Sequence, residues 1–286
     1  MIKQEKFQSK WPRRLRSIFL LLSIFVSFNL PALPQANSVP GGVAIIELGA
    51  SAAKPRVKYN NKNVLVLKQN ENWVAVIGLS LSAKAGKHFL TIQEKNTERK
   101  KSFMVSNKTY KEQRLTIKNK RMVNPNKMDM TRIKSERSRI NNALKYWQDH
   151  DDVEMRFALP VEGRFSSPFG LRRFFNDQPR KPHSGLDIAA PTGTPIKAPS
   201  AGIVVETGDF FFNGNTVFIH HGQGLVTMYC HMDEIKVQSG DRVKQGDILG
   251  TVGMTGRVTG PHLHWSVSLN NARVDPHLFI ADTHSE

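Results

Sequence analysis

The C-terminal half of the chain consists of short apolar runs separated by glycine- and proline-rich segments, and no convincing helical period interrupts them after Phe157. The clearest runs are Gly202–Val205, Thr216–Ile219, Leu225–Tyr229, Asp247–Gly250 and Leu263–Val267. Short β-prone runs bounded by turn residues predict strands of an antiparallel sheet. Side chains from several such strands would meet in one groove, so a site could be assembled from distant parts of the sequence.

Histidine and aspartate residues of this half form a split cluster. His183 and Asp187 are followed by His231, and then by His262 and His264 in an apolar run. A catalytic Zn²⁺ site takes three ligands from His and Asp or Glu and keeps one position open for water. Alternate residues of a strand point to the same face, so both imidazoles of the later pair can enter one site. The pattern predicts a zinc site with His183, Asp187 and one of the later pair, and His231 is a fourth candidate.

The other histidines give a weaker signal. The adjacent residues His220 and His221 point to opposite faces of a strand, so at most one of them could join the site. A lone histidine is more often a satisfied polar residue than a metal ligand, and we interpret four others in this way: His88, His150, His277 and His284.

Several motifs follow one another in the order found in a known family. They are Ser167–Arg172, His183–Ile188, Pro191–Ile196, Gly202–Val204, Gly214–Val217, Tyr229–Met232, Val243–Asp247 and Gly260–Trp265. This part of the chain, about residues 155–280, resembles the lysostaphin/LytM family of zinc metallopeptidases, which cut peptides of bacterial cell-wall peptidoglycan. The resemblance implies a β-sheet metallopeptidase domain that acts on peptidoglycan peptides.

The resemblance also assigns roles that the spacing leaves open. It implies that His183, Asp187 and His264 bind Zn²⁺ and that His231 and His262 are the catalytic histidines beside the metal. These two would accept a proton from the activated water, stabilise the tetrahedral oxyanion and pass a proton to the leaving amine. No HExxH motif is present, so no glutamate base follows from that motif.

Four further residues have both a functional and a structural interpretation. Asn215 could orient the groove, or serve packing or a turn. Arg172 or Arg173 could bind a substrate carboxylate through two parallel hydrogen bonds, or either could be an ordinary surface arginine. Cys230 stands where the family often has Gly or Ala, and we interpret this small residue as packing.

The N-terminus has the pattern of an export signal. Basic residues between Lys10 and Arg16 precede an apolar run of eleven residues, Ile18–Phe28. That length fits the apolar core of a signal peptide and is short for a membrane span, which needs about 20 residues. We place cleavage after Ala36, and an uncleaved membrane anchor is the alternative. Either way we expect export to the periplasm or cell envelope, and the single cysteine excludes an internal disulfide.

The net charge of +17 is unevenly placed. Residues 1–152 carry 29 Lys and Arg against 11 Asp and Glu, or +18, whereas residues 153–286 carry 12 against 13, or −1. Such charge favours anionic membrane or wall surfaces and is screened by salt. We expect no nucleic-acid partner because the chain is predicted to be exported. A solvated basic face without any partner is the alternative.

Residues 39–122 predict a β-rich N-terminal domain. Six β-prone runs are separated by turn-rich pieces: Val43–Leu48, Asn63–Leu67, Trp73–Ile77, His88–Gln93, Lys101–Val105 and Arg114–Ile117. Their length and spacing are typical of a small β-sandwich. Together with the C-terminal half, they predict a mainly β protein.

Residues 123–152 predict a connecting amphipathic helix before the metallopeptidase domain, residues 153–286. A stripe with Arg137 as its one polar interruption recurs at spacings of three and four: Met130, Ile133, Arg137, Ile140, Leu144 and Trp147. Asn126 or Asp129 is the expected N-cap. One helix cannot bury its apolar stripe alone, so it must pack on a domain, bridge the two or lie across the cleft.

Three functions fit these patterns. The leading hypothesis is a zinc endopeptidase that hydrolyses peptide cross-links of peptidoglycan. The alternatives are a non-enzymatic regulator that binds cell wall or partner hydrolases through the same groove, and an exported protein that binds polyanions. The bond between D-Ala and meso-diaminopimelate is our hypothesis for the cleaved bond. The sequence leaves open the oligomeric state and whether the N-terminal half blocks the groove.

Overall fold

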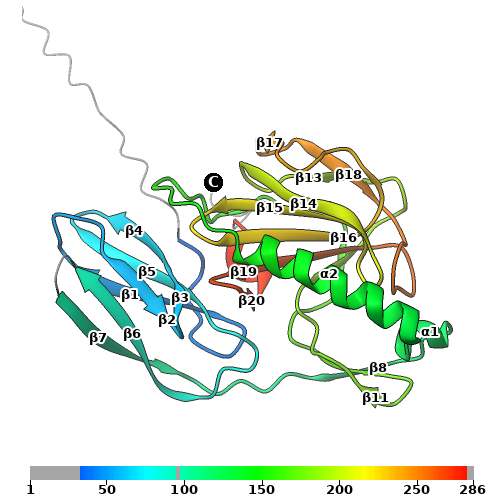
Figure 1. Cartoon of the computed structure of the whole chain (residues 1–286), viewed down its shortest axis with the longest axis horizontal. Helices are drawn as coiled ribbons and strands as arrows, with labels where there is room; N and C mark the ends of the chain where they lie inside the picture. Colours follow the sequence, from blue (N-terminus) through cyan, green and yellow to red (C-terminus); the bar gives the residue numbers. More distant parts are fainter. Residues whose placement is uncertain (1–32, 95–96, 282–286) are drawn as a thin grey trace, which may run out of the picture.

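The computed structural model describes residues 33–94 and 97–281, which form an N-terminal and a larger C-terminal lobe (Figure 1). Both lobes are built mainly from antiparallel strands, as predicted. Most of the predicted leader, residues 1–36, lies outside the described residues. Within the described part of the chain, no helix has the length and apolar character needed to cross a membrane.

The N-terminal lobe contains two sheets. One has the order β1-β5-β4 and the other β3-β2-β6-β7. The strands are β1 (Val43–Gly49), β2 (Arg56–Tyr59), β3 (Lys62–Asn63), β4 (Leu65–Gln69), β5 (Asn72–Gly78), β6 (Gly86–Glu94) and β7 (Thr97–Val105). Buried side chains of both sheets share one core, which includes Val66, Ile77, Leu90 and Ile92. The predicted sandwich is confirmed, and β2 is the strand that the sequence patterns missed.

The sheet β1-β5-β4 is buried on both faces. Its Leu65 and Leu67 pack in the core of the C-terminal lobe, while Val66 between them faces the sandwich core. The side-chain amide of Gln223 accepts from Val66 N at 3.0 Å and donates to Val66 O at 3.1 Å. Asn270 bonds both backbone groups of Gly78 in the same way, at 2.7 and 2.9 Å. The two lobes are therefore joined by apolar packing and by paired hydrogen bonds.

The segment after the sandwich crosses to the other lobe. β8 (Glu112–Leu115) pairs in parallel with β10 (Arg172–Phe175), which also pairs with β11 (Gln178–Pro179). The expectation that Arg114–Ile117 closes the N-terminal series is therefore wrong. Parallel pairing between distant segments uses no local turn, so the sequence carries no short-range signal for it.

Two helices follow, α1 (Lys120–Val123) and α2 (Lys127–Lys145). Asn126 caps α2, because its side chain accepts from Asp129 N at 2.9 Å and its own backbone N–H donates to the Asp129 carboxylate at 3.1 Å. This reciprocal capping box makes Asn126, and not Asp129, the N-cap of the predicted helix.

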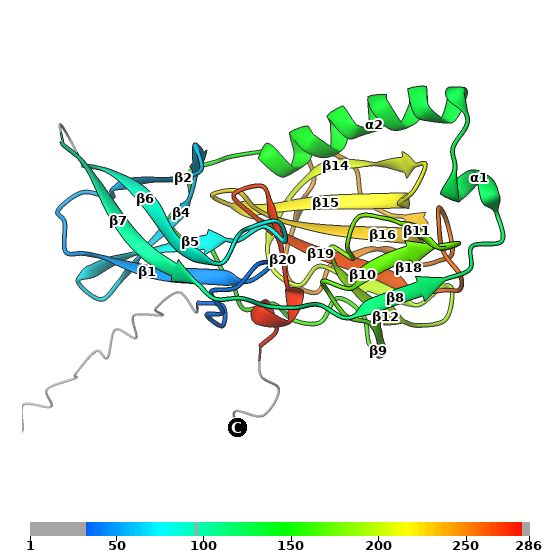
Figure 2. The same ribbon diagram turned by 90° about the horizontal axis from the view of Figure 1, so that it is seen from below.

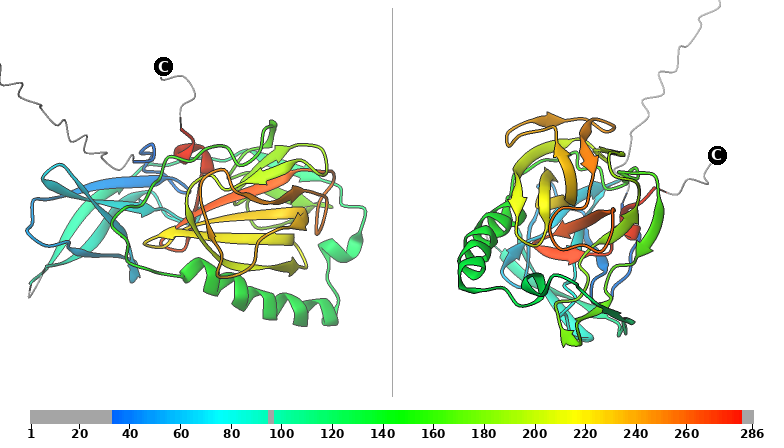
Figure 3. Two further views of the ribbon diagram at one scale, coloured as in Figure 1. Left: turned by 90° about the horizontal axis from the view of Figure 1, so that it is seen from above. Right: turned by 90° about the vertical axis from the view of Figure 1, so that its right-hand side faces the viewer.

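α2 packs on the outer face of the C-terminal sheet (Figures 2 and 3). None of its residues lines the pocket described below, so the helix does not lie across the cleft. Ala143 and Leu144 join a buried cluster with Phe210, Phe218 and other residues of the sheet. Two residues expected in the apolar stripe do not belong to it. Met130 is 50% exposed, and Trp147 lies beyond the last turn, where the backbone has become extended.

The C-terminal lobe holds a ten-stranded sheet with the main order β17-β14-β15-β16-β19-β12-β9. Its strands are β9 (Arg164–Ser167), β12 (Leu186–Ala189), β13 (Pro195–Lys197), β14 (Gly202–Phe210), β15 (Gly214–Gly222), β16 (Leu225–Ile235), β17 (Arg242–Val243), β18 (Ile248–Val252), β19 (Leu263–Leu269) and β20 (Ala272–Val274). A short 3₁₀ helix, Pro276–Phe279, follows them. The predicted antiparallel sheet is confirmed.

The central strands β15, β16 and β19 are buried on both faces. On β16, Tyr229 packs in the main core while the next residue, Cys230, packs under α2. Burial raises the pKa of the Cys230 thiol to about 12, so the side chain is an uncharged packing residue, as we interpreted it. Polar side chains at the ends of these strands are held between two packed layers, which positions the site described next.

Candidate metal centre

Three potential ligand atoms converge at one end of the sheet. His183 Nε2 lies 2.9 Å from Asp187 Oδ1, and His264 Nδ1 lies 2.7 Å from the same oxygen. The two imidazole nitrogens are 3.0 Å apart. Among the described residues, this is the one group of three or more His, Cys, Asp or Glu side chains whose ligand atoms come together closely enough for a metal ion.

Strand pairing explains the convergence. Asp187 on β12 stands directly opposite His264 on β19 in the antiparallel register. The turn that brings His183 to the same side passes Gly185, where a Cβ atom would lie 2.5 Å from the carbonyl oxygen of Trp265. Only glycine fits this close approach, so the glycine of the His-Ser-Gly-Leu-Asp motif is required by the geometry.

Hydrogen bonds orient both imidazoles. His183 is buried, and its Nδ1 donates to the carbonyl oxygen of Pro168 at 2.7 Å, which leaves Nε2 free for a metal. The Nε2 of His264 lies 3.1 Å from the Ser266 hydroxyl, which leaves Nδ1 on the side of Asp187. Metal-binding histidines are commonly fixed in this way by a partner on the second ring nitrogen.

The charges around the three side chains suit a cation. Burial alone would raise the pKa of Asp187, but its close contacts with the rings of His183 and His264 hold that pKa well below its usual value. Burial lowers the pKa of His264 to about 4. Metal ligands must be deprotonated, so an ionised carboxylate beside a neutral imidazole is the required state. Two imidazoles and one carboxylate, of which His264 and Asp187 line a pocket, fit a Zn²⁺ ion with an open position.

His231 reaches the site through an irregularity in β16. Its φ of 65° is left-handed, and the pairing with β15 shifts register in this part of the strand. A bulge of this kind turns one side chain out of the regular alternation. His231 Nδ1 donates to the carbonyl oxygen of Thr255 at 2.8 Å, so Nε2 is left for the pocket. Burial lowers the pKa of His231 well below its usual value, and nearby His264 and His262 lower it further.

His262 lies immediately before β19 and beside His231. The centroids of their rings are 4.9 Å apart. His262 Nε2 is 3.8 Å from Asp187 Oδ1, and its Nδ1 lies 2.8 Å from the carbonyl oxygen of Gly260. His262 is therefore close to the cluster while its Nε2 lies further from Asp187 than the nitrogen of His264 does.

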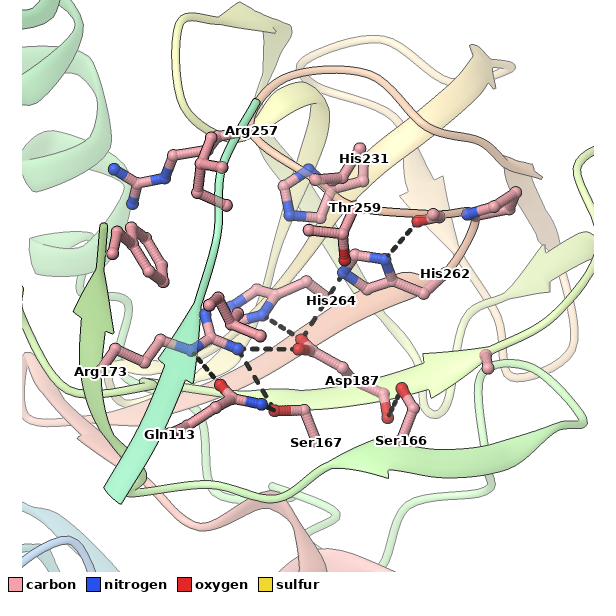
Figure 4. Close-up of a pocket in the computed structure, with 17 residues that line it drawn as sticks. Gln113, Ser166, Ser167, Arg173, Asp187, His231, Arg257, Thr259, His262 and His264 are labelled. Atoms are coloured by element: carbon pink, nitrogen blue, oxygen red, sulfur yellow. Dashed lines mark hydrogen bonds and ion pairs between the residues drawn. The ribbon is translucent and has the colours of Figure 1, made fainter. Parts of the chain in front are cut away.

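Asp187, His231, His262 and His264 line a pocket of about 260 Å³ (Figure 4). Arg173 lies in the pocket wall and donates to Asp187 Oδ2 at 2.9 Å, the oxygen that does not face the two histidines. Gln113 from β8 accepts from Arg173 Nε at 3.1 Å, and Ser167 contacts both of these side chains. This network fixes the orientation of the Asp187 carboxylate.

The structure places the remaining candidates outside this pocket. Arg172 is exposed and pairs with Glu112 at 3.4 Å, so Arg173 is the member of the pair in the pocket wall. Asn215 lies on β15, and its Nδ2 donates to the carbonyl oxygen of Asp233 on β16 at 2.8 Å. The substrate contacts predicted for Arg172 and Asn215 stay predictions.

The other histidines have partners elsewhere. His221 is held between the carbonyl oxygen of Ala201 and the Thr227 hydroxyl, and His220 lies 3.2 Å from Gly224 N. Neither His220 nor His221 lines the pocket. This agrees with the expectation that at most one of them could join the site.

Sequence reasoning missed two groups of residues in the pocket. Gln113, Leu115 and Ile117 come from β8 and the residues just after it, and the crossing of this segment to the C-terminal lobe had no sequence signal. Arg257 lies in the loop that leads to His262, and its only signal was its position inside a glycine-rich stretch next to a predicted site residue.

Two family profiles match the chain. Residues 181–276 match "Peptidase family M23" and residues 36–108 match "Peptidase family M23 N-terminal domain". The crystal structure of a candidate peptidase M23 from Pseudomonas aeruginosa superposes with a TM-score of 0.73 at 42% identity, covering 85% of this chain and 95% of that one. The similarity therefore includes both lobes.

Curated relatives match a shorter part of the chain. The peptidoglycan DD-endopeptidase ShyC of Vibrio cholerae is 45% identical over 114 residues, which are 40% of this chain and 26% of ShyC. The DD-carboxypeptidase/endopeptidase Mpg of Neisseria meningitidis is 41% identical over 116 residues, 41% of this chain and 27% of Mpg. The matched segment thus spans about a quarter of the length of these relatives.

Proposed function

Because the chain belongs to peptidase family M23, we propose that it is a zinc-dependent endopeptidase that hydrolyses peptide cross-links of bacterial peptidoglycan. The observation that carries this proposal is a cluster of three potential ligands, His183, Asp187 and His264, beside a pocket. Asp187 and His264 line that pocket together with His231 and His262. A protein that only binds cell wall would not need two further imidazoles beside an intact ligand set.

His183, Asp187 and His264 would hold the ion. When bound there, Zn²⁺ supplies Lewis acidity toward water and toward a peptide carbonyl. Arg173 keeps the second oxygen of Asp187 occupied, so Oδ1 is the oxygen presented to the ligand cluster.

His231 and His262 would carry the protons of the reaction. The Nδ1 of each ring lies within 3 Å of a backbone carbonyl, at Thr255 and at Gly260 respectively, so each presents Nε2 to the pocket. The lowered pKa keeps His231 neutral at neutral pH, and a neutral imidazole can accept the proton of the attacking water. An imidazolium formed in this way can then stabilise the tetrahedral oxyanion and pass the proton to the leaving amine.

The substrate proposal rests on the relatives. ShyC is named a peptidoglycan DD-endopeptidase, and Mpg a DD-carboxypeptidase/endopeptidase. We therefore propose the D,D-bond of the cross-link, between D-Ala and meso-diaminopimelate, as the bond that is cut. Such a substrate requires export to the periplasm or cell envelope.

Digestion of purified sacculi tests this proposal. Chromatography and mass spectrometry of the released muropeptides should show cross-linked dimers converted to monomers, with new termini at D-Ala and at the side-chain amine of diaminopimelate. A chelator should stop the release and added Zn²⁺ should restore it. Release of fragments cut only at other bonds would contradict the bond assignment, and no release from the zinc-loaded protein would contradict the activity.

A further inference from the structure

Arg257 is a pocket residue that the proposed chemistry does not use. It lies in the loop before His262, and its side chain lines the same pocket as Asp187 and His264. Figure 4 places Arg257 on one side of this pocket and His262 on the other, with Asp187 and His264 between them. A group bound at Arg257 would therefore be part of a ligand that also reaches the metal cluster.

No acidic side chain neutralises Arg257 within residues 33–94 and 97–281. Asp187 is the only acidic residue among those that line the pocket, and it is already paired with Arg173 at 2.9 Å. The one hydrogen bond of the Arg257 guanidinium to a described residue is a long contact of 3.4 Å from Nη1 to the carbonyl oxygen of Met122. A partly buried positive charge without a carboxylate partner is costly unless a ligand supplies one.

Neighbouring charges increase this cost. Burial lowers the pKa of Arg257 to about 10, and the positive charges of Arg173 and Arg180 contribute in the same direction. Arg180 itself donates to Val123 O, Asn124 Oδ1 and Gln178 Oε1, which are neutral acceptors. Arg257 still carries its charge at neutral pH, so this end of the pocket is positive and favours an anion.

Two aromatic rings hold the guanidinium in place. Its Cζ lies 4.8 Å from the ring centroid of Phe175 and 4.3 Å from that of Phe212. Arginine stacked on aromatic faces keeps its N–H groups available in the plane of the guanidinium, where they can bind a carboxylate through two parallel bonds. Because the side chain is already ordered, binding loses little rotamer entropy.

We propose that Arg257 binds a carboxylate of the substrate peptide and so determines specificity. The ligand class is an acidic peptide, and the contact would favour stem peptides with a free carboxylate over amidated ones. This inference rests on the proposed function, because it takes the peptide in the pocket to be the substrate of the metal centre.

The test compares two substrates and three proteins. The substrates are a cross-linked muropeptide dimer with free carboxylates and the same dimer amidated at them. The proteins are wild type, Arg257→Gln, and Arg242→Gln as a control at an exposed arginine on β17. Wild type should prefer the free dimer. Arg257→Gln should lose about ten- to a hundredfold in kcat/KM on the free dimer, mainly through KM, and little on the amidated dimer.

A binding measurement separates this proposal from the activity. The free and amidated dimers are titrated into the metal-free protein by calorimetry, alongside zinc content and Tm of each variant. Tighter binding of the free dimer to wild type, lost in Arg257→Gln at unchanged Tm, would support the carboxylate site even if no bond were cut. An equal affinity of wild type for both dimers, or an equal loss on both in Arg257→Gln, would overturn it. Arg257→Lys should keep part of the preference, since it keeps the charge without the planar pair of donors.

Discussion

The hairpin β6–β7 and the strand pair β16–β19 are both antiparallel ladders, but they differ in how many of their faces are buried. On β7, Lys100 and Met104 are exposed while Phe103 and Val105 are buried. On β16, every residue from Leu225 to Met232 is buried. One face of the hairpin meets water, whereas both faces of the central pair meet protein.

This difference decides what a polar residue on each ladder can mean. A lysine on the outer face of β7 is solvated and needs no partner. A polar group between two packed layers must find a hydrogen bond or a ligand. Thr227 on β16 has His221 and Tyr229 as partners, and His264 on β19 has Asp187 and Ser266. Buried polar residues of the central strands are therefore the informative ones.

The largest effect should follow from Asp187→Ala. The change removes a ligand and the partner of Arg173, so the protein should lose its bound zinc and at least about a thousandfold in turnover. Metal analysis and muropeptide release measure the two losses together. Glu234→Gln, at an exposed acidic residue of β16, is the control and should change neither. Stoichiometric zinc in Asp187→Ala would remove Asp187 from the ligand set.

His231→Ala should separate metal binding from turnover. His231 is not one of the three side chains whose ligand atoms come together, so its removal should leave zinc bound. Loss of a positioned acid–base group should lower kcat by about 10²–10⁴. His277→Ala, at a half-exposed histidine outside the pocket, is the control. An unchanged kcat would exclude a catalytic role for His231.

Leu144→Ala tests whether α2 provides the second buried face. Leu144 is buried against the sheet, so truncation should lower the free energy of unfolding by about 2–5 kcal/mol. Met130→Ala on the same helix removes a side chain that is 50% exposed, and it should change the stability by less than about 0.5 kcal/mol. Urea denaturation of both variants measures the contrast, and equal effects would contradict the packing described for α2.

His221 predicts a dependence of stability on pH. Burial lowers its pKa from 6.5 to about 4, so between these values the unfolded chain binds a proton that the folded chain does not. The resulting stability is present above pH 6.5 and is lost as the pH falls toward 4, by up to about 3 kcal/mol. His221→Gln should remove this share, as seen in urea midpoints from pH 7 to 4. The same slope in both proteins would show that His221 does not contribute.

The smallest effect on stability belongs to the hairpin. Lys100→Gln on the exposed face of β7 should change the free energy of unfolding by less than about 0.5 kcal/mol. We propose that the basic N-terminal half binds anionic surfaces, so the same change should weaken binding to anionic vesicles slightly at low salt. Cosedimentation at two salt concentrations measures it, and binding that is independent of salt would contradict an electrostatic surface.

Sequence reasoning singled out five residues of the candidate site because they are chemically distinctive. His183, Asp187, His231, His262 and His264 were all named, and the structure brings them together. Spacing alone did not choose His264 over His262, since alternate residues share a face. The choice depends on the register that sets His264 opposite Asp187, and register is a property of the sheet.

The rest of the pocket could not be predicted because it depends on non-local contacts. Gln113 reaches the site through the parallel pairing of β8 with β10. The role proposed for Arg257 depends on its stacking against Phe175 and Phe212, which are distant from it in sequence. Strand content was predictable from alternation and turns, whereas the crossing of the β8 segment to the C-terminal lobe was not.

The most direct measurement of the central claim is zinc content and muropeptide release for residues 37–286, beside the His264→Ala variant. The account predicts one zinc per chain and chelator-sensitive release for the parent, with both lost in the variant. A parent protein that binds no zinc and releases no muropeptides would contradict the proposed peptidase.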